Sequence, residues 1–249
     1  MPSRLASLAA ELAEPVPGVA AEIAPGDMML HGDPAHYAVA GQSAWRCIAT
    51  GLLAAGVADP KRVLDLPCGH GRVTRVLRRA LPDAELTVCD LDRDGVDHCA
   101  SAFGATPVYS REDLAEVGFD EAFDLIWCGS LVTHLDKPGW LATFQLVMRS
   151  LRPQGVAVIT FHGRWSAYRM QTGKNYGLPR ARVEQILASY AATGFGYADY
   201  ENGTGYGVSL NSPAWLIGEV QAWQELRIVA LCERQWDDHQ DVLVVQAMG

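Results

Sequence analysis

The sequence contains no run of about 20 consecutive apolar residues, the length that a membrane-spanning helix needs. The apolar stretch near the start, residues 5–10, is followed by Glu11 and is shorter than the hydrophobic region of a secretory signal peptide. The six cysteines form no Cys-x-x-Cys pair and have no spacing typical of a zinc site or a disulfide framework. These absences predict a cytoplasmic protein with reduced thiols and no membrane partner.

Basic residues are scarcer than acidic ones. The chain has 20 lysines and arginines against 29 aspartates and glutamates, which gives a formal net charge of −9 at pH 7. A negative field repels the phosphate backbone of nucleic acids, and no local basic patch offsets it, so we expect no nucleic-acid partner. With 249 residues, of which 49% are hydrophobic and 20% charged, the composition is that of a globular protein rather than a disordered one.

From residue 62 onward, short apolar runs rich in β-formers alternate with helical stretches. Strands are expected at residues 63–66, 86–89, 107–109, 123–128, 156–161, 226–232 and 242–247, with helices at 72–80, 94–103 and 140–151. This alternation indicates βαβ units and a parallel sheet covered on both faces. Because only nine residues (233–241) separate the last two strands, no helical crossover fits between them. The sequence thus predicts an α/β fold: a doubly wound, seven-stranded, mostly parallel sheet with an antiparallel last strand.

The start of the chain has a different pattern. Residues 3–14 and 42–55 have the apolar periodicity of amphipathic helices, and a stretch marked by glycine and proline lies between them. We therefore expect an N-terminal helical segment over residues 1–41, followed by the main domain over residues 42–249.

Residues 163–212, rich in glycine, tyrosine and asparagine, interrupt the main domain and predict an inserted cap. Within it, residues 195–201 and 204–210 predict a β-hairpin joined by a tight type I′ turn at Asn202–Gly203. After it, Asn211 or Ser212 as N-cap before Pro213 predicts a helix that continues to about residue 223.

The strongest local signal is VLDLPCGHGRVTRVL at residues 63–77, an apolar strand followed by a glycine-rich turn and a helix. Gly69 and Gly71 allow the backbone to approach a ligand closely, and the helix N-terminus behind them favours polar or anionic groups. Asp90 ends the next expected strand, where a carboxylate can accept hydrogen bonds from both hydroxyls of a ribose. Together these features predict a nucleoside-binding half-sheet.

Thr74 and Asp65 bear on which nucleoside binds. A dinucleotide-binding turn has a third glycine where this chain has Thr74, and it does not require the acid Asp65. A carboxylate at that position suits a ligand that carries a cation, and S-adenosylmethionine carries both a sulfonium and an ammonium. The two residues disfavour an NAD(P)-dependent oxidoreductase, which is the alternative enzyme class. A non-catalytic S-adenosylmethionine-binding module is the alternative outside enzymes.

With these residues the chain resembles the class I S-adenosylmethionine-dependent methyltransferases over about residues 42–162. Their first motif, acid-x-Gly-x-Gly-x-Gly, matches Asp65, Gly69 and Gly71, with Pro67 in place of the first glycine. The resemblance implies a Rossmann-like methyltransferase fold, S-adenosyl-L-methionine as cofactor and S-adenosyl-L-homocysteine as product. The cofactor-binding residues that it implies are Asp65, Pro67, Gly69, Gly71, Asp90, Leu91, Ser110, Cys128, Gly129 and Ser130. Glu112 is the alternative to Ser110 for a contact with the adenine amine.

Two histidines are candidates for a general base. The resemblance places His134, after the fourth strand, near the reactive methyl group, and His162 directly follows the fifth strand. A neutral imidazole can take the proton of a hydroxyl acceptor, whereas an amine that is already deprotonated needs no base. Methyl transfer depends mainly on proximity and orientation, and His134 has a purely structural role as its alternative. No Asp/Asn/His cluster predicts a metal site.

The inserted cap leaves the sheet at the carboxyl end of the fifth strand, where open α/β sheets bind ligands. With the segment His31–Tyr37, it is expected to close over the cofactor and to select a small-molecule or sugar-like acceptor. Tyr37, Trp165 and Tyr206 are the candidate acceptor contacts. The residues leave open whether the methyl group goes to oxygen or to nitrogen. The alternative role for the cap is a contact between two copies in a homodimer.

Overall fold

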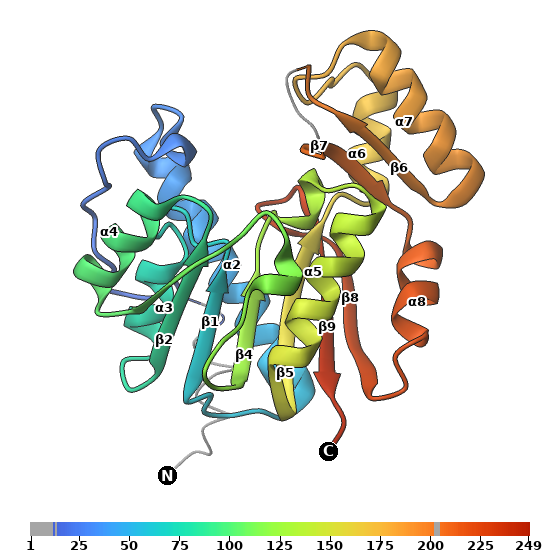
Figure 1. Cartoon of the computed structure of the whole chain (residues 1–249). Coiled ribbons are helices and arrows are strands. Elements are labelled where there is room, and N and C mark those ends of the chain that lie inside the picture. The colour runs from blue at the N-terminus through green and yellow to red at the C-terminus, as the bar shows by residue number, and fades with distance from the viewer. Residues whose placement is uncertain (1–11, 13, 202–204) are drawn as a thin grey trace.

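The computed structural model describes residues 12, 14–201 and 205–249, and its largest element is a sheet of seven strands (Figure 1). The strands are β1 (Arg62–Leu66), β2 (Glu85–Asp90), β3 (Thr106–Tyr109), β4 (Phe123–Cys128), β5 (Leu151–Phe161), β8 (Leu226–Trp236) and β9 (Gln240–Ala247). They lie in the order β3-β2-β1-β4-β5-β9-β8. Strands β1 to β5 pair in parallel, and β9 is antiparallel to both of its neighbours. The predicted seven-stranded, mostly parallel sheet with an antiparallel last strand is confirmed.

Helices cover both faces of this sheet. The described helices that flank it are α2 (Pro34–Ala55), α3 (Thr74–Ala80), α4 (Arg93–Phe103), α5 (Lys137–Ser150) and α8 (Pro213–Gln221). Helices α2, α3 and α4 pack on one face, and α5 and α8 on the other. Neighbouring residues of a strand face opposite layers: Val63 of β1 belongs to the first core and Leu64 to the second. The sheet is therefore doubly wound, as expected for parallel strands that are buried on both faces.

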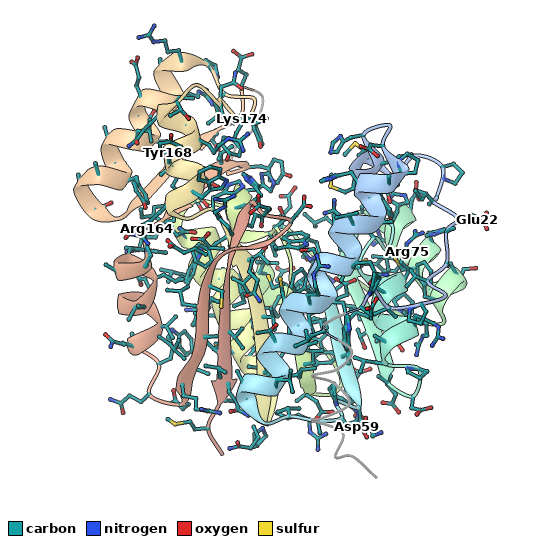
Figure 2. All side chains as sticks on the ribbon, turned by 180° about the vertical axis from the view of Figure 1, so that it is seen from behind. Glu22, Asp59, Arg75, Arg164, Tyr168 and Lys174 are labelled. Carbon is teal, nitrogen blue, oxygen red and sulfur yellow. The ribbon has the colours of Figure 1, made fainter. Side chains whose placement is uncertain are left out.

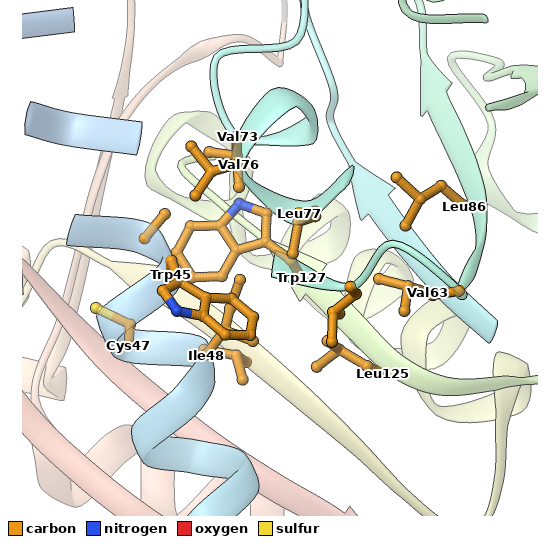
Figure 3. Packing of buried hydrophobic residues seen from close by; sticks show 14 of the residues in the cluster. Trp45, Cys47, Ile48, Val63, Val73, Val76, Leu77, Leu86, Leu125 and Trp127 are labelled. Carbon is orange, nitrogen blue, oxygen red and sulfur yellow. The ribbon is translucent and has the colours of Figure 1, made fainter. Parts of the chain in front are cut away.

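Two tryptophans form the centre of the first core (Figure 3). Trp45 of α2 and Trp127 of β4 are almost completely buried, and Val76 and Leu77 of α3 pack beside them. Replacing a buried tryptophan by alanine typically costs about 3–5 kcal/mol of stability. This packing fixes the carboxyl end of β4 relative to α2 and α3.

Helix α2 begins at Pro34, and the expected start at residue 42 is wrong. The Asp33 side chain accepts a hydrogen bond from the backbone N–H of His36, and Pro34 occupies the first turn, so a capped helix starts there. Gly41 lies inside this helix, and its lack of a side chain allows α2 to pass close to the loop after β1. A Cβ on Gly41 would lie 2.7 Å from the Arg72 carbonyl oxygen. The expected helix over residues 3–14 falls, apart from residues 12 and 14, outside the described part of the chain.

The inserted segment forms a separate layer above the carboxyl ends of the strands (Figure 1). It contains α6 (Arg164–Gln171), α7 (Arg180–Thr193), β6 (Phe195–Asp199) and β7 (Gly207–Asn211). Its own core consists of Ala167, Met170, Leu178, Ile186, Ala198, Val208 and Leu210. Helices α6 and α7 were not expected from the sequence. Helix α7 buries little beyond Ile186, so it has almost no apolar periodicity to detect.

The predicted hairpin is present: strands β6 and β7 pair Asp199 with Gly207, and the Tyr200 N–H donates to the Tyr206 carbonyl at 3.1 Å. Asp199 Oδ1 accepts hydrogen bonds from the Gly205 N–H (2.8 Å) and the Tyr197 hydroxyl (2.6 Å) at the end of the hairpin. The predicted turn at Asn202–Gly203 lies outside the described residues. The predicted helix start after the hairpin is confirmed: Ser212 caps α8, and Pro213 follows it.

No helix in the described ranges is both long and apolar enough to cross a membrane. The same residues contain no group of three or more histidine, cysteine, aspartate or glutamate side chains arranged to hold a metal ion. A cytoplasmic location stays a prediction.

Candidate active site

The glycine loop, residues 67–73, connects β1 to α3 at the carboxyl edge of the sheet. Gly69 and Gly71 have φ of +50° and +85°, a region that favours glycine. A Cβ on Gly71 would lie 2.5 Å from a ring carbon of Phe103, so this glycine lets the loop pack against α4. A Cβ on Gly69 would meet nothing within 4 Å. The backbone at Gly69 therefore faces open space in which a ligand can lie.

Asp90, the last residue of β2, is bonded to the glycine loop. Its Oδ2 accepts a hydrogen bond from the Gly69 N–H at 2.7 Å, and its Oδ1 accepts one from the Asp92 N–H at 3.0 Å. An ionised carboxylate has about four acceptor positions, so each oxygen keeps capacity for a ribose hydroxyl. Leu91 beside it is 59% exposed, which leaves an apolar surface for a base to cover. The Ser110 N–H donates to the Asp90 carbonyl at 2.8 Å.

Asp65 of β1 is buried, with an exposed fraction of 2%, and only one of its two carboxylate oxygens accepts a hydrogen bond from the described residues. Its Oδ2 accepts a hydrogen bond from the Thr74 hydroxyl at 2.6 Å, whereas Oδ1 has no partner among the described residues. Burial is the main cause that raises the pKa of this carboxyl to about 7. A buried acceptor without a donor costs about 1–3 kcal/mol, so the site favours a ligand with a cationic N–H. Thr74 supplies a hydroxyl that the glycine of a dinucleotide-binding turn would lack.

The loop that follows β4 is held by a buried polar network. The Ser130 N–H donates to the Thr160 hydroxyl at 2.8 Å, and Thr160 donates to Gln240 Oε1 at 2.6 Å. Gln240 Nε2 donates in turn to the Ser130 hydroxyl at 3.0 Å. This network fixes Ser130, whose φ of +61° is unusual for a residue with a side chain. Thr160 and Gln240 were not expected at this site, since no local sequence motif connects β5 and β9 to this loop.

Cys128 and Gly129 contribute backbone rather than reactive side chains. The Cys128 side chain is completely buried, and burial raises the pKa of its thiol to about 12, so the thiol stays protonated. A Cβ on Gly129 would lie 2.5 Å from Trp127 Nε1, so a larger residue would disturb the core below.

His134 lies between the β4 loop and the cap. Its Nδ1 is 2.9 Å from the Gly207 carbonyl oxygen, which requires Nδ1 to carry the proton and leaves the lone pair on Nε2. Burial lowers the pKa of His134, so the imidazole is neutral at neutral pH. The ring stacks on Tyr206, with centroids 4.9 Å apart, and the Tyr200 hydroxyl is 3.3 Å from Nδ1. His134 therefore has the protonation state that a general base requires.

A second group of rings, the polar cluster, consists of His162, Tyr176 and His239 with Ser166. The three ring centroids are 5.1, 5.3 and 5.6 Å apart, although the rings come from the end of β5, the α6–α7 loop and the β8–β9 turn. His162 is 5% exposed, and burial lowers its pKa to about 3. His162 Nδ1 is buried without a hydrogen-bond partner in the described part of the chain. The Tyr176 and Ser166 hydroxyls lie close enough together for a hydrogen bond from Ser166 to oppose the effect of burial, which raises the pKa of Tyr176. Such a concentration of buried polar groups suits a polar ligand or water.

The structure places the three predicted acceptor contacts differently. Tyr206 is 52% exposed, stacks on His134, and has its pKa raised by burial and by the charge of Asp90, so it lies near the carboxyl end of β2. Trp165 packs against Arg234, whose Cζ is 4.0 Å from the ring centroid, and lines a surface groove of about 370 Å³. Arg164 and Tyr168, which also line this groove, lie on α6 (Figure 2). Tyr37 is buried, and its hydroxyl donates to Asp27 at 2.7 Å.

Comparison with known proteins shows that this chain is similar to methyltransferases. Residues 63–155 match the family model described as a methyltransferase domain. The chain is 26% identical over 149 residues to a putative methyltransferase, YqeM, of Bacillus subtilis, covering 58% of this chain and 60% of that protein. It is 24% identical over 132 residues to malonyl-[acyl-carrier protein] O-methyltransferase of Anoxybacillus flavithermus, covering 53% of this chain and 50% of that protein. The matches thus span between half and three fifths of these relatives.

Solved structures show the same fold. An S-adenosylmethionine-dependent methyltransferase from Clostridium acetobutylicum superposes with a TM-score of 0.58 at 15% identity, covering 90% of this chain and 96% of that one. The N-methyltransferase NodS from Bradyrhizobium japonicum, crystallised with S-adenosyl-L-homocysteine, has a TM-score of 0.54 at 15% identity and covers 99% of both chains. At these identities the likeness establishes the fold. Together with the family model, it confirms the resemblance stated from the sequence.

Proposed function

We propose that this chain acts as a class I S-adenosylmethionine-dependent methyltransferase and transfers the methyl group of S-adenosylmethionine to an oxygen or nitrogen atom of a small-molecule or sugar-like acceptor. The observation that carries the proposal is the arrangement around the glycine loop. Asp65 Oδ1 is buried and has no donor among the described residues, a side chain at Gly69 would meet open space, and Asp90 keeps free acceptor positions. These are the groups that an ammonium, a nucleoside and a ribose require, so the residues fit the cofactor.

In this proposal, separate residues at the carboxyl edge of the sheet bind separate parts of the cofactor. Asp65 accepts from the ammonium, the backbone at Gly69 and Gly71 lies against the nucleoside, and Asp90 accepts from the ribose hydroxyls. Leu91 packs on the adenine. Pro67, Ser110, Cys128, Gly129 and Ser130 complete the proposed contact set. When bound, S-adenosylmethionine supplies a methyl group on a positively charged sulfur.

The chain's own contribution to transfer is positioning and proton removal. Positioning can supply several kcal/mol of the barrier reduction when the reacting atoms are held in line. We assign the base to His134, because the Gly207 carbonyl leaves its Nε2 lone pair available. The pKa of His162 is too low for its imidazole to take up a second proton, so its proposed role is to accept or donate a hydrogen bond.

We place the acceptor under the cap, between Tyr206 and the polar cluster. His134 lies close enough to His162 for the charge of one to lower the pKa of the other, so base and cluster border the same region. The cluster offers hydroxyls and neutral imidazoles, which match a hydroxyl-bearing acceptor better than a charged one. Flat rings beside these groups also suit the face of a sugar or an aromatic ring.

The test has two stages. Calorimetry on the purified protein should show binding of S-adenosyl-L-homocysteine and far weaker binding of NAD. Incubation with S-adenosylmethionine and a panel of sugars, phenols and amines should then release S-adenosyl-L-homocysteine and a methylated product, both detected by mass spectrometry. Tight NAD binding without S-adenosyl-L-homocysteine binding would sink the proposal.

A further inference from the structure

Strand β7 pairs with β6 along one edge and meets the loop after β4 along the other. Within the described ranges, β6 and β7 form a sheet of two strands, so the outer edge of β7 keeps backbone groups for another partner. The η3 turn (Val132–His134) lies beside that edge. The cap and the loop that carries His134 are therefore joined along a strand edge.

The contacts along this edge follow an antiparallel order. They connect Tyr206 with Leu135, Gly207 with His134, and Ser209 with Val132. The first is a backbone bridge, and in the second the Gly207 carbonyl oxygen lies 2.9 Å from His134 Nδ1. In the third, the Ser209 hydroxyl donates to the Val132 carbonyl at 2.6 Å. We call these three contacts the β7 clamp.

Two residues of β7 make this arrangement possible. A Cβ on Gly207 would collide with the Ala198 carbonyl oxygen of β6, so a glycine is needed for the two strands to pair here. The Ser209 side chain is completely buried, and its hydroxyl ties β7 to the first residue of the η3 turn. Together they fix where the Gly207 carbonyl stands relative to His134.

The Gly207 carbonyl decides which nitrogen of the neutral His134 ring carries the proton. A carbonyl oxygen only accepts, so Nδ1 must donate and the lone pair stays on Nε2. A neutral imidazole in water favours the opposite tautomer, in which Nε2 carries the proton and cannot accept another. The Tyr200 hydroxyl, 3.3 Å from Nδ1, can donate or accept and so imposes neither tautomer.

We propose that the β7 clamp positions the base: it holds His134 in the tautomer with the proton on Nδ1, so that Nε2 can accept a proton only while the cap is seated on the η3 turn. Ser209 is a positioning residue, because its hydroxyl bonds the turn and not the imidazole. The importance of the tautomer for catalysis rests on the proposed function. The cap then has a part in proton removal besides contacting the acceptor.

The experiment is nuclear magnetic resonance of the ¹⁵N-labelled protein, because the shifts of the two ring nitrogens show which one is protonated. The signals lost in His134→Ala identify this residue, and in the unaltered protein the proton should be on Nδ1. Ser209→Ala should lower the ratio of the Nδ1–H to the Nε2–H tautomer by about 2- to 12-fold, the effect of one neutral hydrogen bond. Ser189→Ala is the matched control: it removes a hydrogen bond inside the cap, to the Phe195 carbonyl at 2.9 Å, and should leave the ratio unchanged.

Turnover with an acceptor from the panel gives a second measurement. Ser209→Ala should lower kcat by about 2- to 12-fold and leave KM and S-adenosyl-L-homocysteine affinity within a few-fold. A proton on Nε2 in the unaltered protein, an unchanged ratio in Ser209→Ala, or an equal change in Ser189→Ala would overturn the inference. If the unaltered protein does not bind S-adenosyl-L-homocysteine, the proposed function fails instead, and the tautomer ratio still decides on the clamp.

Discussion

Replacing Asp65 by asparagine should stabilise the ligand-free protein at neutral pH while weakening cofactor binding. Burial raises the pKa of this carboxyl from 3.8 to about 7. A raised pKa of an acid destabilises the folded state as the pH rises, because the unfolded chain releases the proton near pH 4, whereas the folded chain keeps it until about pH 7. Asp65 therefore lowers stability progressively between these pH values. At about 1.36 kcal/mol per unit, the loss reaches up to about 4 kcal/mol above pH 7.

Asparagine removes this loss but brings a smaller one. Its Oδ1 can still accept from Thr74, while its amide N–H₂ takes the place of the unpartnered oxygen. A buried donor without an acceptor costs about 1–3 kcal/mol, so the net gain should be about 1–3 kcal/mol. For a chain of this length that corresponds to roughly 2–4 °C in Tm per kcal/mol.

The assay is urea or thermal unfolding of both proteins without ligand, at pH 5 and pH 8. The stability advantage of Asp65→Asn should grow between pH 5 and pH 8, and calorimetry should show a loss of S-adenosyl-L-homocysteine affinity. A variant that is less stable than the unaltered protein at pH 8 would refute the reasoning, since Asp65 would then be satisfied in the folded state. Thr74→Val, which removes the donor to Oδ2, should shift stability in the opposite direction.

Three further predictions concern other residues of the candidate active site. Asp90→Ala should weaken S-adenosyl-L-homocysteine binding by about 10- to 150-fold in calorimetry; an unchanged affinity would show that the carboxylate only organises the loop. His134→Ala should slow methyl transfer by about 10²–10⁴-fold with cofactor affinity within a few-fold. Near-normal turnover of this variant would show that His134 only packs against its neighbours, and His162→Ala would be assayed next. Tyr206→Ala should raise the acceptor KM or lower turnover without changing cofactor affinity, whereas Tyr168→Ala, exposed on α6, should change neither. If Tyr206→Ala alters only the mass of the protein in solution, the cap is an interface between copies.

The parts of the site that could be predicted from the sequence are those built by neighbouring segments. Asp65, Gly69 and Asp90 come from one strand–loop–helix–strand unit, so their order along the chain determines that they meet. The sheet itself follows from the same logic, because apolar runs of strand length alternate with helices between residues 62 and 161.

The parts that could not be predicted depend on contacts between distant segments. Gln240 reaches Ser130 because β9 inserts next to β5, and the three rings of the polar cluster come from three separate segments of the chain.

The cap has a core of its own, and this has a consequence for how the protein can diverge. The buried residues of the cap core are different from those of the two cores beside the sheet. Substitutions that reshape the cap therefore leave the packing around the glycine loop intact. The match to the family model agrees with this separation, since it ends at residue 155, before the cap begins. If the proposed function is correct, selection can thus exchange the acceptor through the cap while the glycine loop is inherited unchanged.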